Sequence, residues 1–362
     1  MAPDRGIEEA TALLNLGTQH DELVTEKKTA TETIPPHLSH DPATNTKQSD
    51  PFQFGQRFLS EDDDVFAYNA WDHVEPDTAH HEYCETQYAA QRASPVSDFD
   101  RTRFNEHPEK WWDLFYKQKT STFFKDRKWL IQEFPVLSEV TRPDAGKKVV
   151  LEIGAGAGNT AFPILRLNEN PELKLFAVDF SKKAVETMRN AQDYAESKGV
   201  MTAEVWDVAG ETLPPNVDEG SVDIVIMIFI FSALNPKQWQ QALLNIQRVL
   251  KPGGEVLFRD YGRGDLAQVR FKAGRWMEDN FYVRGDGTRV YFFEKEELET
   301  IWRGAFDICN LDVDRRLIVN RQRRIKMYRC WIQGRFRKKN YSDTTACAAF
   351  NASLEPPPHR NR

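Results

Sequence analysis

The chain has 362 residues, 40% of them apolar and including 23 Phe and 9 Trp, which is enough material for a large core. No run of 18 apolar residues occurs, so a membrane span is not expected, and the acidic N-terminus lacks the pattern of a signal or transit peptide. We therefore expect a cytoplasmic protein. Four cysteines without CxxC spacing argue against a disulfide framework and a zinc site, so no metal is expected.

The net charge of −7 conceals an uneven distribution of charges. Residues 1–100 hold 20 acidic and 6 basic side chains, whereas residues 311–340 hold 11 basic and 2 acidic ones. A basic segment of this kind suggests a polyanionic partner, although an ordinary solvated face has the same composition.

Four segments are expected from the composition along the chain. Residues 1–50 are polar and weakly periodic, which is typical of a disordered tail. Aromatic residues recur from residue 51, so an N-terminal extension is predicted over 51–110. The main domain is predicted over 111–340, and a flexible C-terminal tail over 341–362.

The stretch Glu109–Lys117 predicts an amphipathic helix, in which Trp112, Phe115 and Tyr116 form one aromatic stripe. Such a stripe is either ordinary core packing or a surface that covers a ligand. A cation over an aromatic face gains roughly 1–2 kcal/mol when it is desolvated. A positively charged ligand group would therefore suit this helix.

The segment Val149–Asn159 joins a β-branched run to three glycines spaced by two. The run predicts a buried parallel strand, and Gly154, Gly156 and Gly158 predict a tight turn where the backbone approaches a ligand. A helix is expected from Asn159 to Leu167. The spacing differs from the GxGxxG of dinucleotide folds. It resembles the first motif of Rossmann-like, S-adenosylmethionine-dependent methyltransferases.

From Lys148 onward, predicted strands and helices alternate, which indicates an α/β fold with a mostly parallel, doubly wound sheet. Among them are a helix that Ser181 caps and that runs to about residue 197, a strand over 203–208 and a strand over 222–230. Ligands of such sheets bind outside the carboxyl ends of the strands. Five residues are therefore expected around one crevice: Gly154, Asp179, Asp207, Ile228 and Asp260. Asp179 is placed to accept hydrogen bonds from ribose hydroxyls and Asp207 from an adenine amino group, unless each merely caps a turn or loop.

The chain has no histidine between residues 108 and 358, so a histidine triad is not expected in the sheet domain. Methyl transfer is compatible with this lack of histidine, because transfer from an activated sulfonium donor needs mainly alignment and desolvation of the reactants. Asp260 and Asp286 are candidates for orienting a substrate amino group. The pair Asp286-Gly287 also predicts a hairpin turn.

A set of motifs, in order and spacing, resembles the tRNA N3-methylcytidine methyltransferases over roughly residues 52–339. The motifs are Trp112–Tyr116, Phe123–Arg127, Leu151–Gly154, Asp179–Ser181, Ile228–Ala233, Leu250–Gly253, Phe258–Gly262, Asn280–Arg284 and Asp286–Arg289. The resemblance implies a class I methyltransferase fold with an N-terminal helical and aromatic extension. It also implies S-adenosyl-L-methionine as cofactor and methylation of cytidine 32 in the anticodon loop. Phe54–Leu59 and Asn69–Asp72 are similar to the cytoplasmic branch that acts on threonine tRNAs.

Two groups of site residues are expected, the cofactor contacts chiefly from this resemblance and the RNA contacts from the basic charge of their segments. Cofactor contacts are expected at Trp112, Tyr116, Gly154, Gly156, Gly158, Asp179, Asp207, Val208 and Ile228. RNA contacts are expected at Lys125, Arg127, Arg259, Arg270, Arg284, Arg289, Arg335, Arg337, Lys338 and Lys339. The extension over 51–110 is a further candidate for tRNA binding, and an auxiliary protein such as an aminoacyl-tRNA synthetase is a candidate partner. The alternatives are a small-molecule or other RNA N-methyltransferase, and a non-catalytic RNA-binding scaffold.

Overall fold

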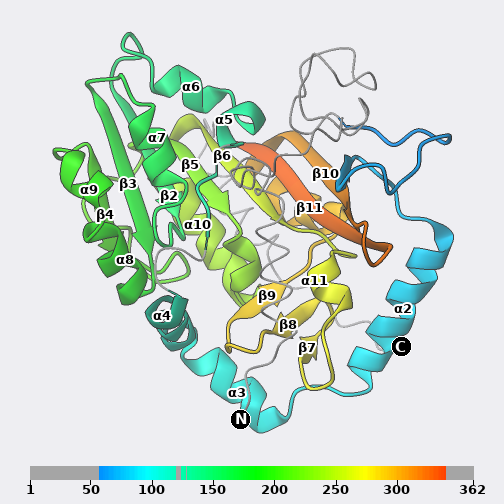
Figure 1. Ribbon diagram of the computed structural model, residues 1–362. Helices are drawn as coiled ribbons and strands as arrows, with labels where there is room; N and C mark the ends of the chain where they lie inside the picture. The colour runs from blue at the N-terminus through cyan, green and yellow to red at the C-terminus, as the bar shows by residue number, and fades with distance from the viewer. Residues whose placement is uncertain (1–56, 120–123, 128, 340–362) are drawn as a thin grey trace, which may run out of the picture.

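A computed structural model describes residues 57–119, 124–127 and 129–339. Its main sheet has eight strands in the order β1-β10-β11-β6-β5-β2-β3-β4 (Figure 1). Their bounds are β1 Ala70–Asp72, β2 Lys148–Ile153, β3 Leu173–Asp179, β4 Met201–Val205, β5 Val222–Ile228, β6 Leu250–Tyr261, β10 Phe306–Asn320 and β11 Ile325–Lys338. Strands β2 to β6 pair in parallel, and β11, β10 and β1 extend the sheet antiparallel beyond β6. The doubly wound α/β fold is thereby confirmed.

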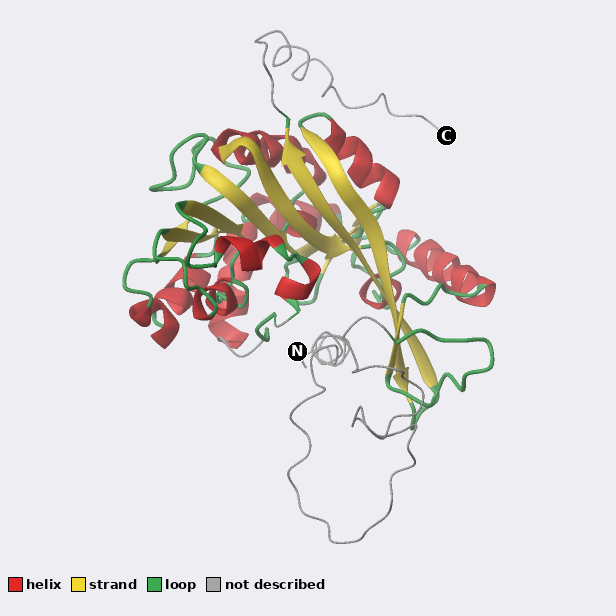
Figure 2. Cartoon of the chain, turned by 90° about the horizontal axis from the view of Figure 1, so that it is seen from above, coloured by secondary structure: helices red, strands yellow, loops and turns green. Residues whose placement is uncertain are grey.

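Helices lie on both sides of the twisted sheet (Figure 2). They are α2 Thr78–Arg92, α3 Asp98–Glu106, α4 Pro108–Lys119, α5 Leu130–Glu133, α6 Val136–Val140, α7 Ala161–Arg166, α8 Lys182–Arg189, α9 Gln192–Glu196, α10 Trp239–Val249, α11 Leu266–Val269 and α12 Lys295–Arg303. Short 3-10 turns occur at η3 Phe231–Ala233 and η4 Pro236–Gln238. Alternate residues of β5 enter two separate cores. Val225 and Met227 pack with Leu243 and Leu298, whereas Ile226 packs with Ile164.

Three predicted boundaries around the sheet need correction. The helix expected from Asn159 begins only at Ala161, with Thr160 as its N-cap. The strand expected over 203–208 spans Met201–Val205. The helix expected to run from Ser181 to about 197 is two helices, because Ala191 between them is extended. Ser181 itself caps α8 as predicted, since its side chain accepts a hydrogen bond from the backbone N–H of Ala184.

A smaller sheet follows β6, with the strands β7 Trp276–Glu278, β8 Phe281–Val283 and β9 Arg289–Tyr291 in that order. The turn at Asp286-Gly287 joins β8 to β9, so the predicted hairpin is confirmed. Gly287 is left-handed (φ +87°), and a β-carbon there would clash with the ring of Trp111 in α4. The hairpin turn therefore packs directly under α4.

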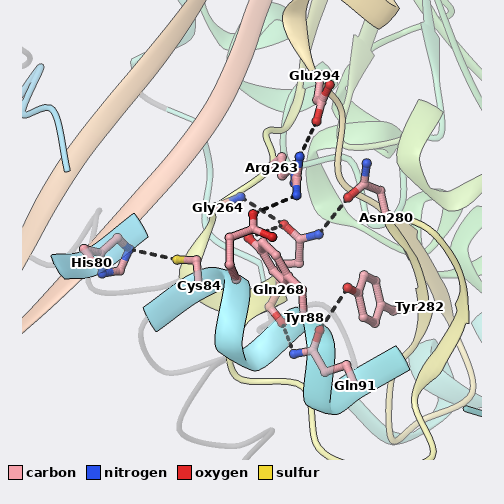
Figure 3. Close-up of polar contacts among 11 residues, drawn as sticks. His80, Cys84, Tyr88, Gln91, Arg263, Gly264, Gln268, Asn280, Tyr282 and Glu294 are labelled. Atoms are coloured by element: carbon pink, nitrogen blue, oxygen red, sulfur yellow. Dashed lines mark hydrogen bonds and ion pairs between the residues drawn. The ribbon is translucent and has the colours of Figure 1, made fainter. Parts of the chain in front are cut away.

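A buried polar network links α2 to the segment after β6, which contains α11 and the smaller sheet (Figure 3). The side-chain amide of Gln91 donates to the backbone carbonyls of Gln268, Val269 and Phe271 at 3.0 to 3.3 Å. Its oxygen accepts a hydrogen bond from the Tyr282 hydroxyl at 2.9 Å. Every polar atom of the Gln91 side chain is thus used to hold the predicted extension against β8, α11 and the loop after α11.

The β10–β11 hairpin runs past the carboxyl end of its neighbour β6. Trp331 pairs with Tyr261 at the carboxyl end of β6, whereas Arg337 pairs with Glu255 nearer its start. The residues that precede Trp331 therefore continue beyond the carboxyl end of the sheet. The turn over 321–324 lies at that end, as do α4 and β7–β9 in Figure 1.

Candidate active site

A pocket lies beyond the carboxyl ends of β2, β3, β5 and β6, where the sequence predicts a crevice. It is lined by Trp112, Phe115, Tyr116, Phe124, Lys125, Arg127, Trp129, Gly154, Ala155, Gly156, Asn159, Asp179, Phe180, Ile228, Phe229, Ile230, Ser232, Ala233, Tyr261, Arg284, Asp286 and Thr288. Six of the nine predicted cofactor residues are among them. Gly158, Asp207 and Val208 are not.

The glycine turn has the left-handed backbone that the sequence predicts. Gly154 and Gly156 have φ values of +67° and +59°. A β-carbon on residue 154 would lie 2.7 Å from Cδ1 of Ile230, and one on residue 156 would clash with the hydroxyl of Tyr116. Gly158 instead makes room for the ring of Phe162. At this turn, backbone atoms without side chains therefore form part of the pocket wall.

Asp179 lies at the end of β3, behind the glycine turn. Its Oδ2 accepts a hydrogen bond from the N–H of Gly156 and its Oδ1 from the N–H of Ser181, each at 2.9 Å. Burial of the carboxylate raises its pKa to about 6, and the nearby carboxylate of Asp113 acts in the same direction. Each oxygen keeps a further lone pair, so Asp179 can still accept hydrogen bonds from a ligand.

Helix α4 covers this side of the pocket. Asp113 accepts hydrogen bonds from the Ser181 hydroxyl at 2.6 Å and from the Lys183 N–H at 3.1 Å, which fixes α4 to the start of α8. The predicted helix is confirmed, and its aromatic stripe lies partly in the core and partly at the pocket, while its contact with a ligand stays a prediction. Phe115 and Tyr116 are buried together, while Trp112 and Tyr116 line the pocket.

Asp207 and Val208 lie apart from the residues that line the pocket. The exposed carboxylate of Asp207 accepts a hydrogen bond from the Ala209 N–H at 2.9 Å, as a loop cap does. Val208 is buried in the core, and its carbonyl accepts from the Asn245 side chain. Because β4 ends at Val205, both follow the strand in a loop. Their contact with a cofactor stays a prediction.

The two candidate catalytic carboxylates shape the pocket wall. Asp260 is fully buried and accepts hydrogen bonds from the N–H groups of Ser232 at 2.9 Å and Tyr261 at 2.8 Å. Burial raises its pKa to about 6. Asp260 therefore lies behind Ser232, which lines the pocket, and is not itself part of the lining. Asp286 does line it, while accepting hydrogen bonds from the N–H and the hydroxyl of Thr288.

Glu152, the acid before the first glycine, belongs to the motif Leu151–Gly154 but was not predicted as a site residue. Its carboxylate is buried and lies 3.7 Å from the guanidinium of Arg127. Burial raises the pKa of Glu152 to about 7, and the positive charge of Arg127 opposes this shift. Arg127 also donates through its backbone N–H to the Asn159 carbonyl at 3.0 Å. The pair therefore joins the segment after α4 to the floor of the glycine turn.

Two aromatic residues that the sequence did not single out form the wall on the β5 and β6 side. The rings of Phe229 and Tyr261 lie with their centroids 4.9 Å apart. The Arg284 guanidinium lies 5.8 Å from the ring of Tyr261. The sequence predicts Phe229 inside a strand over 222–230, whereas β5 ends at Ile228 and Phe229 directly follows it. Tyr261 ends a strand as predicted. The signals in the sequence were these strand ends and the motifs Ile228–Ala233 and Phe258–Gly262.

Comparison with known proteins identifies the family. A methyltransferase domain family matches residues 151–256. The chain is 50% identical over 285 residues to the tRNA N(3)-methylcytidine methyltransferase of Schizosaccharomyces pombe, covering 79% of this chain and 92% of that protein. The chain belongs to the tRNA N(3)-methylcytidine methyltransferase family.

Two other relatives of the methyltransferase are consistent with this assignment. A tRNA(Thr) (cytosine(32)-N(3))-methyltransferase of Saccharomyces cerevisiae is 51% identical over 289 residues, with 79% of this chain and 46% of that protein covered. The chain thus spans about half the length of the baker's yeast relative. A human tRNA N(3)-cytidine methyltransferase is 37% identical over 363 residues, with 81% and 95% covered.

The structure brings three of the basic residues predicted for RNA contact to the pocket of this methyltransferase, namely Lys125, Arg127 and Arg284. Two others are buried. Arg259 forms an ion pair with Asp314, and Arg289 donates to Asn105 at 2.8 Å. Arg270 follows α11 and is not among the pocket residues.

The four basic residues near the end of β11 lie at the opposite end of the sheet. Arg335 and Arg337 both pair with Glu255. Lys338 and Lys339 donate to the backbone carbonyls of Leu250 and Arg303, each at 2.7 Å. The sequence could not show this placement, because it depends on the antiparallel register of β11 with β6. Their role in RNA binding stays a prediction.

Within the described part of the methyltransferase, no helix has the length and apolar character that crossing a membrane requires. In residues 57–119, 124–127 and 129–339, no three His, Cys, Asp or Glu side chains gather as metal ligands would.

Proposed function

We propose that this chain transfers a methyl group from S-adenosylmethionine to N3 of cytidine 32 in the anticodon loop of threonine tRNA. The observation that supports the proposal is a single pocket with two chemically different walls. One wall holds the glycine turn, Asp179 and helix α4, and the other holds aromatic rings with the cationic side chains of Arg127 and Arg284. The tRNA and the position of the cytidine are taken from the name of the baker's yeast relative.

The first wall fits S-adenosylmethionine. Gly154 and Gly156 leave no room for side chains and present their backbone to the pocket, and Asp179 keeps lone pairs for two ribose hydroxyls. Trp112 and Tyr116 can face a sulfonium group, which aromatic rings attract. Asp207 and Val208 would hold the adenine. When bound, the cofactor supplies an activated methyl group.

The second wall suits an unpaired pyrimidine. N3 of cytosine lies on the Watson–Crick edge, so the base must leave any pair before it can react. The anticodon loop offers unstacked bases of this kind. Lys125, Arg127 and Arg284 provide positive charge for the backbone phosphates near the target.

The chain's own residues need only orient the base and exclude water. The N3 lone pair of a neutral cytosine is available without a general base, so the absence of histidine from the described pocket lining is no obstacle. Methylation at N3 leaves positive charge on the base. The carboxylate of Asp286, at the pocket wall, is placed to balance that charge.

The wider binding surface, the auxiliary protein and the cytoplasmic location are parts of the same proposal. The basic turn of the β10–β11 hairpin lies at the carboxyl end of the sheet, where the pocket opens. It supports a contact with the anticodon stem beyond the loop. A synthetase partner would hold the rest of the tRNA.

Methyl transfer from labelled S-adenosylmethionine to total tRNA tests the proposal, with nucleoside digestion and identification by mass. N3-methylcytidine should form with the wild-type chain and be absent with Asp179→Ala. If the wild-type chain binds the cofactor and forms no such product, the small-molecule alternative is favoured. If it binds RNA without binding the cofactor, the scaffold alternative is favoured.

A further inference from the structure

Phe229 has an unusual backbone for an aromatic residue. It directly follows β5 and has a φ of +60°, in the left-handed region that residues with a β-carbon rarely adopt. Its N–H donates to the Arg259 carbonyl at 2.8 Å, which fixes this conformation against β6. Backbone strain of this kind persists where the surrounding structure imposes it, and it is concentrated at functional sites.

The left-handed backbone changes the side of the sheet on which the ring lies. Along β5, Met227 packs into one core and Ile228 into the other. The next residue of a regular strand would return to the first core, because side chains alternate. Phe229 instead packs against the cluster of Ile228 and against that of Tyr261. The strain therefore takes an aromatic ring out of the core and turns it into the pocket.

The surroundings of the ring suit a flat, electron-poor ligand group. Phe229 is only partly buried and lines the pocket. Its ring lies 4.9 Å from that of Tyr261, tilted by 40°, and 5.9 Å from the Arg127 guanidinium. An aromatic face with a cationic neighbour is the kind of platform on which bases of single-stranded nucleic acid stack.

We propose that Phe229 is the residue on which the target cytosine stacks in the reactive position. This inference rests on the proposed function, and it assigns the substrate base to the β5 wall. The cofactor has its own contacts at Asp179, the glycine turn and α4. As the N3–methyl bond forms and the sulfur–methyl bond breaks, the base acquires positive charge. The π face of Phe229 attracts that charge, so the contact strengthens toward the transition state.

Three substitutions distinguish the effect of the aromatic ring at position 229 from the effect of the left-handed backbone. Phe229→Leu keeps an apolar side chain and removes the aromatic face, and it should lower kcat/KM for tRNA about 10- to 100-fold. Phe229→Tyr keeps the face and should stay within about 3-fold of the wild type. Phe229→Asn suits the left-handed backbone but has no ring, and it should be as impaired as the leucine variant. All three should bind S-adenosylmethionine with the wild-type Kd, measured by titration calorimetry.

A second measurement reports stacking without turnover. An anticodon stem-loop that carries fluorescent pyrrolocytosine at position 32 should be quenched by the wild type and Phe229→Tyr, and less by Phe229→Leu and Phe229→Asn. Equal quenching and equal kcat/KM in the wild-type and leucine chains would overturn the inference. If the wild type itself makes no N3-methylcytidine, the proposed function fails, and the fluorescence still decides whether Phe229 stacks on the base.

Discussion

The hydroxyl group of Tyr116 occupies the space that a β-carbon on residue 156 would need. Gly156→Ala should therefore abolish S-adenosylmethionine binding in titration calorimetry, because the turn or α4 must move. Tyr116→Phe in the same chain should restore part of the affinity, since it removes the obstructing atom. Gly146→Ala is the matched control, because Gly146 has a similar φ of +67° with no atom near its added β-carbon. An equal loss of affinity in that control would show that backbone strain alone is responsible.

The stability of the cofactor-free chain should fall as the pH rises from about 4 to about 7. Asp179 and Asp260 have pKa values raised to about 6 by burial, and the pKa of Glu152 is raised to about 7. The folded chain then holds protons that the unfolded chain has already lost. The stabilisation is fully present below the unfolded pKa values and is lost through the folded ones. Melting temperatures at pH 5 and pH 8 check this, and Asp260→Asn should reduce the difference.

Cofactor binding should depend on pH in the opposite direction. Ribose hydroxyls donate to an ionised carboxylate, so affinity should rise as the pH passes through about 6, where Asp179 ionises. Calorimetric titrations between pH 5 and pH 8 measure the effect. Asp113→Asn removes a neighbouring negative charge and should move the transition to lower pH. A transition that does not move would contradict the coupling between these two carboxylates.

Gln91→Leu should destabilise the chain by about 1–3 kcal/mol, since it removes the hydrogen bonds of Gln91 with the Tyr282 hydroxyl and with three backbone carbonyls, most of them in buried contacts. Urea unfolding gives the value. Gln87→Leu is the control on the same helix, because Gln87 is only half-buried. A loss of stability that is equally large in the control would show that the network is not what holds α2.

The salt dependence of tRNA binding should distinguish two basic groups on β11 and its turn. Replacing Arg321, Arg323, Arg324 and Lys326 with glutamine should reduce the slope of log K against log salt by roughly 2 to 4, because they lie at the pocket end of the sheet. Replacing Arg335, Arg337, Lys338 and Lys339 should change it less, since these side chains already have partners in the chain. Equal effects of the two replacements would favour the broader surface that the sequence predicts.

Local patterns predicted the parts of the site that local chemistry determines. The strand before Gly154, the position of Asp179 and the hairpin at Asp286-Gly287 all follow from residues within one short window. The hydrogen bond from the Ser232 N–H to the Asp260 carboxylate joins residues on two elements, and no pattern in the sequence predicts it. Phe229 follows its strand in sequence, yet its left-handed backbone depends on the contact with β6.

Strand β1 is synthesised before the other strands of the sheet, and its only paired neighbour in the described chain, β10, is synthesised near the end of that chain. In β1, Ala70 pairs with Ile318 of β10, so almost the whole described chain separates two residues that share a ladder. At the usual pace of translation, β10 leaves the ribosome on the order of 10 s or more after β1. The parallel strands β2 to β6 are complete earlier. The sheet therefore closes late in synthesis, and contacts of such high sequence separation make its last step a slow one.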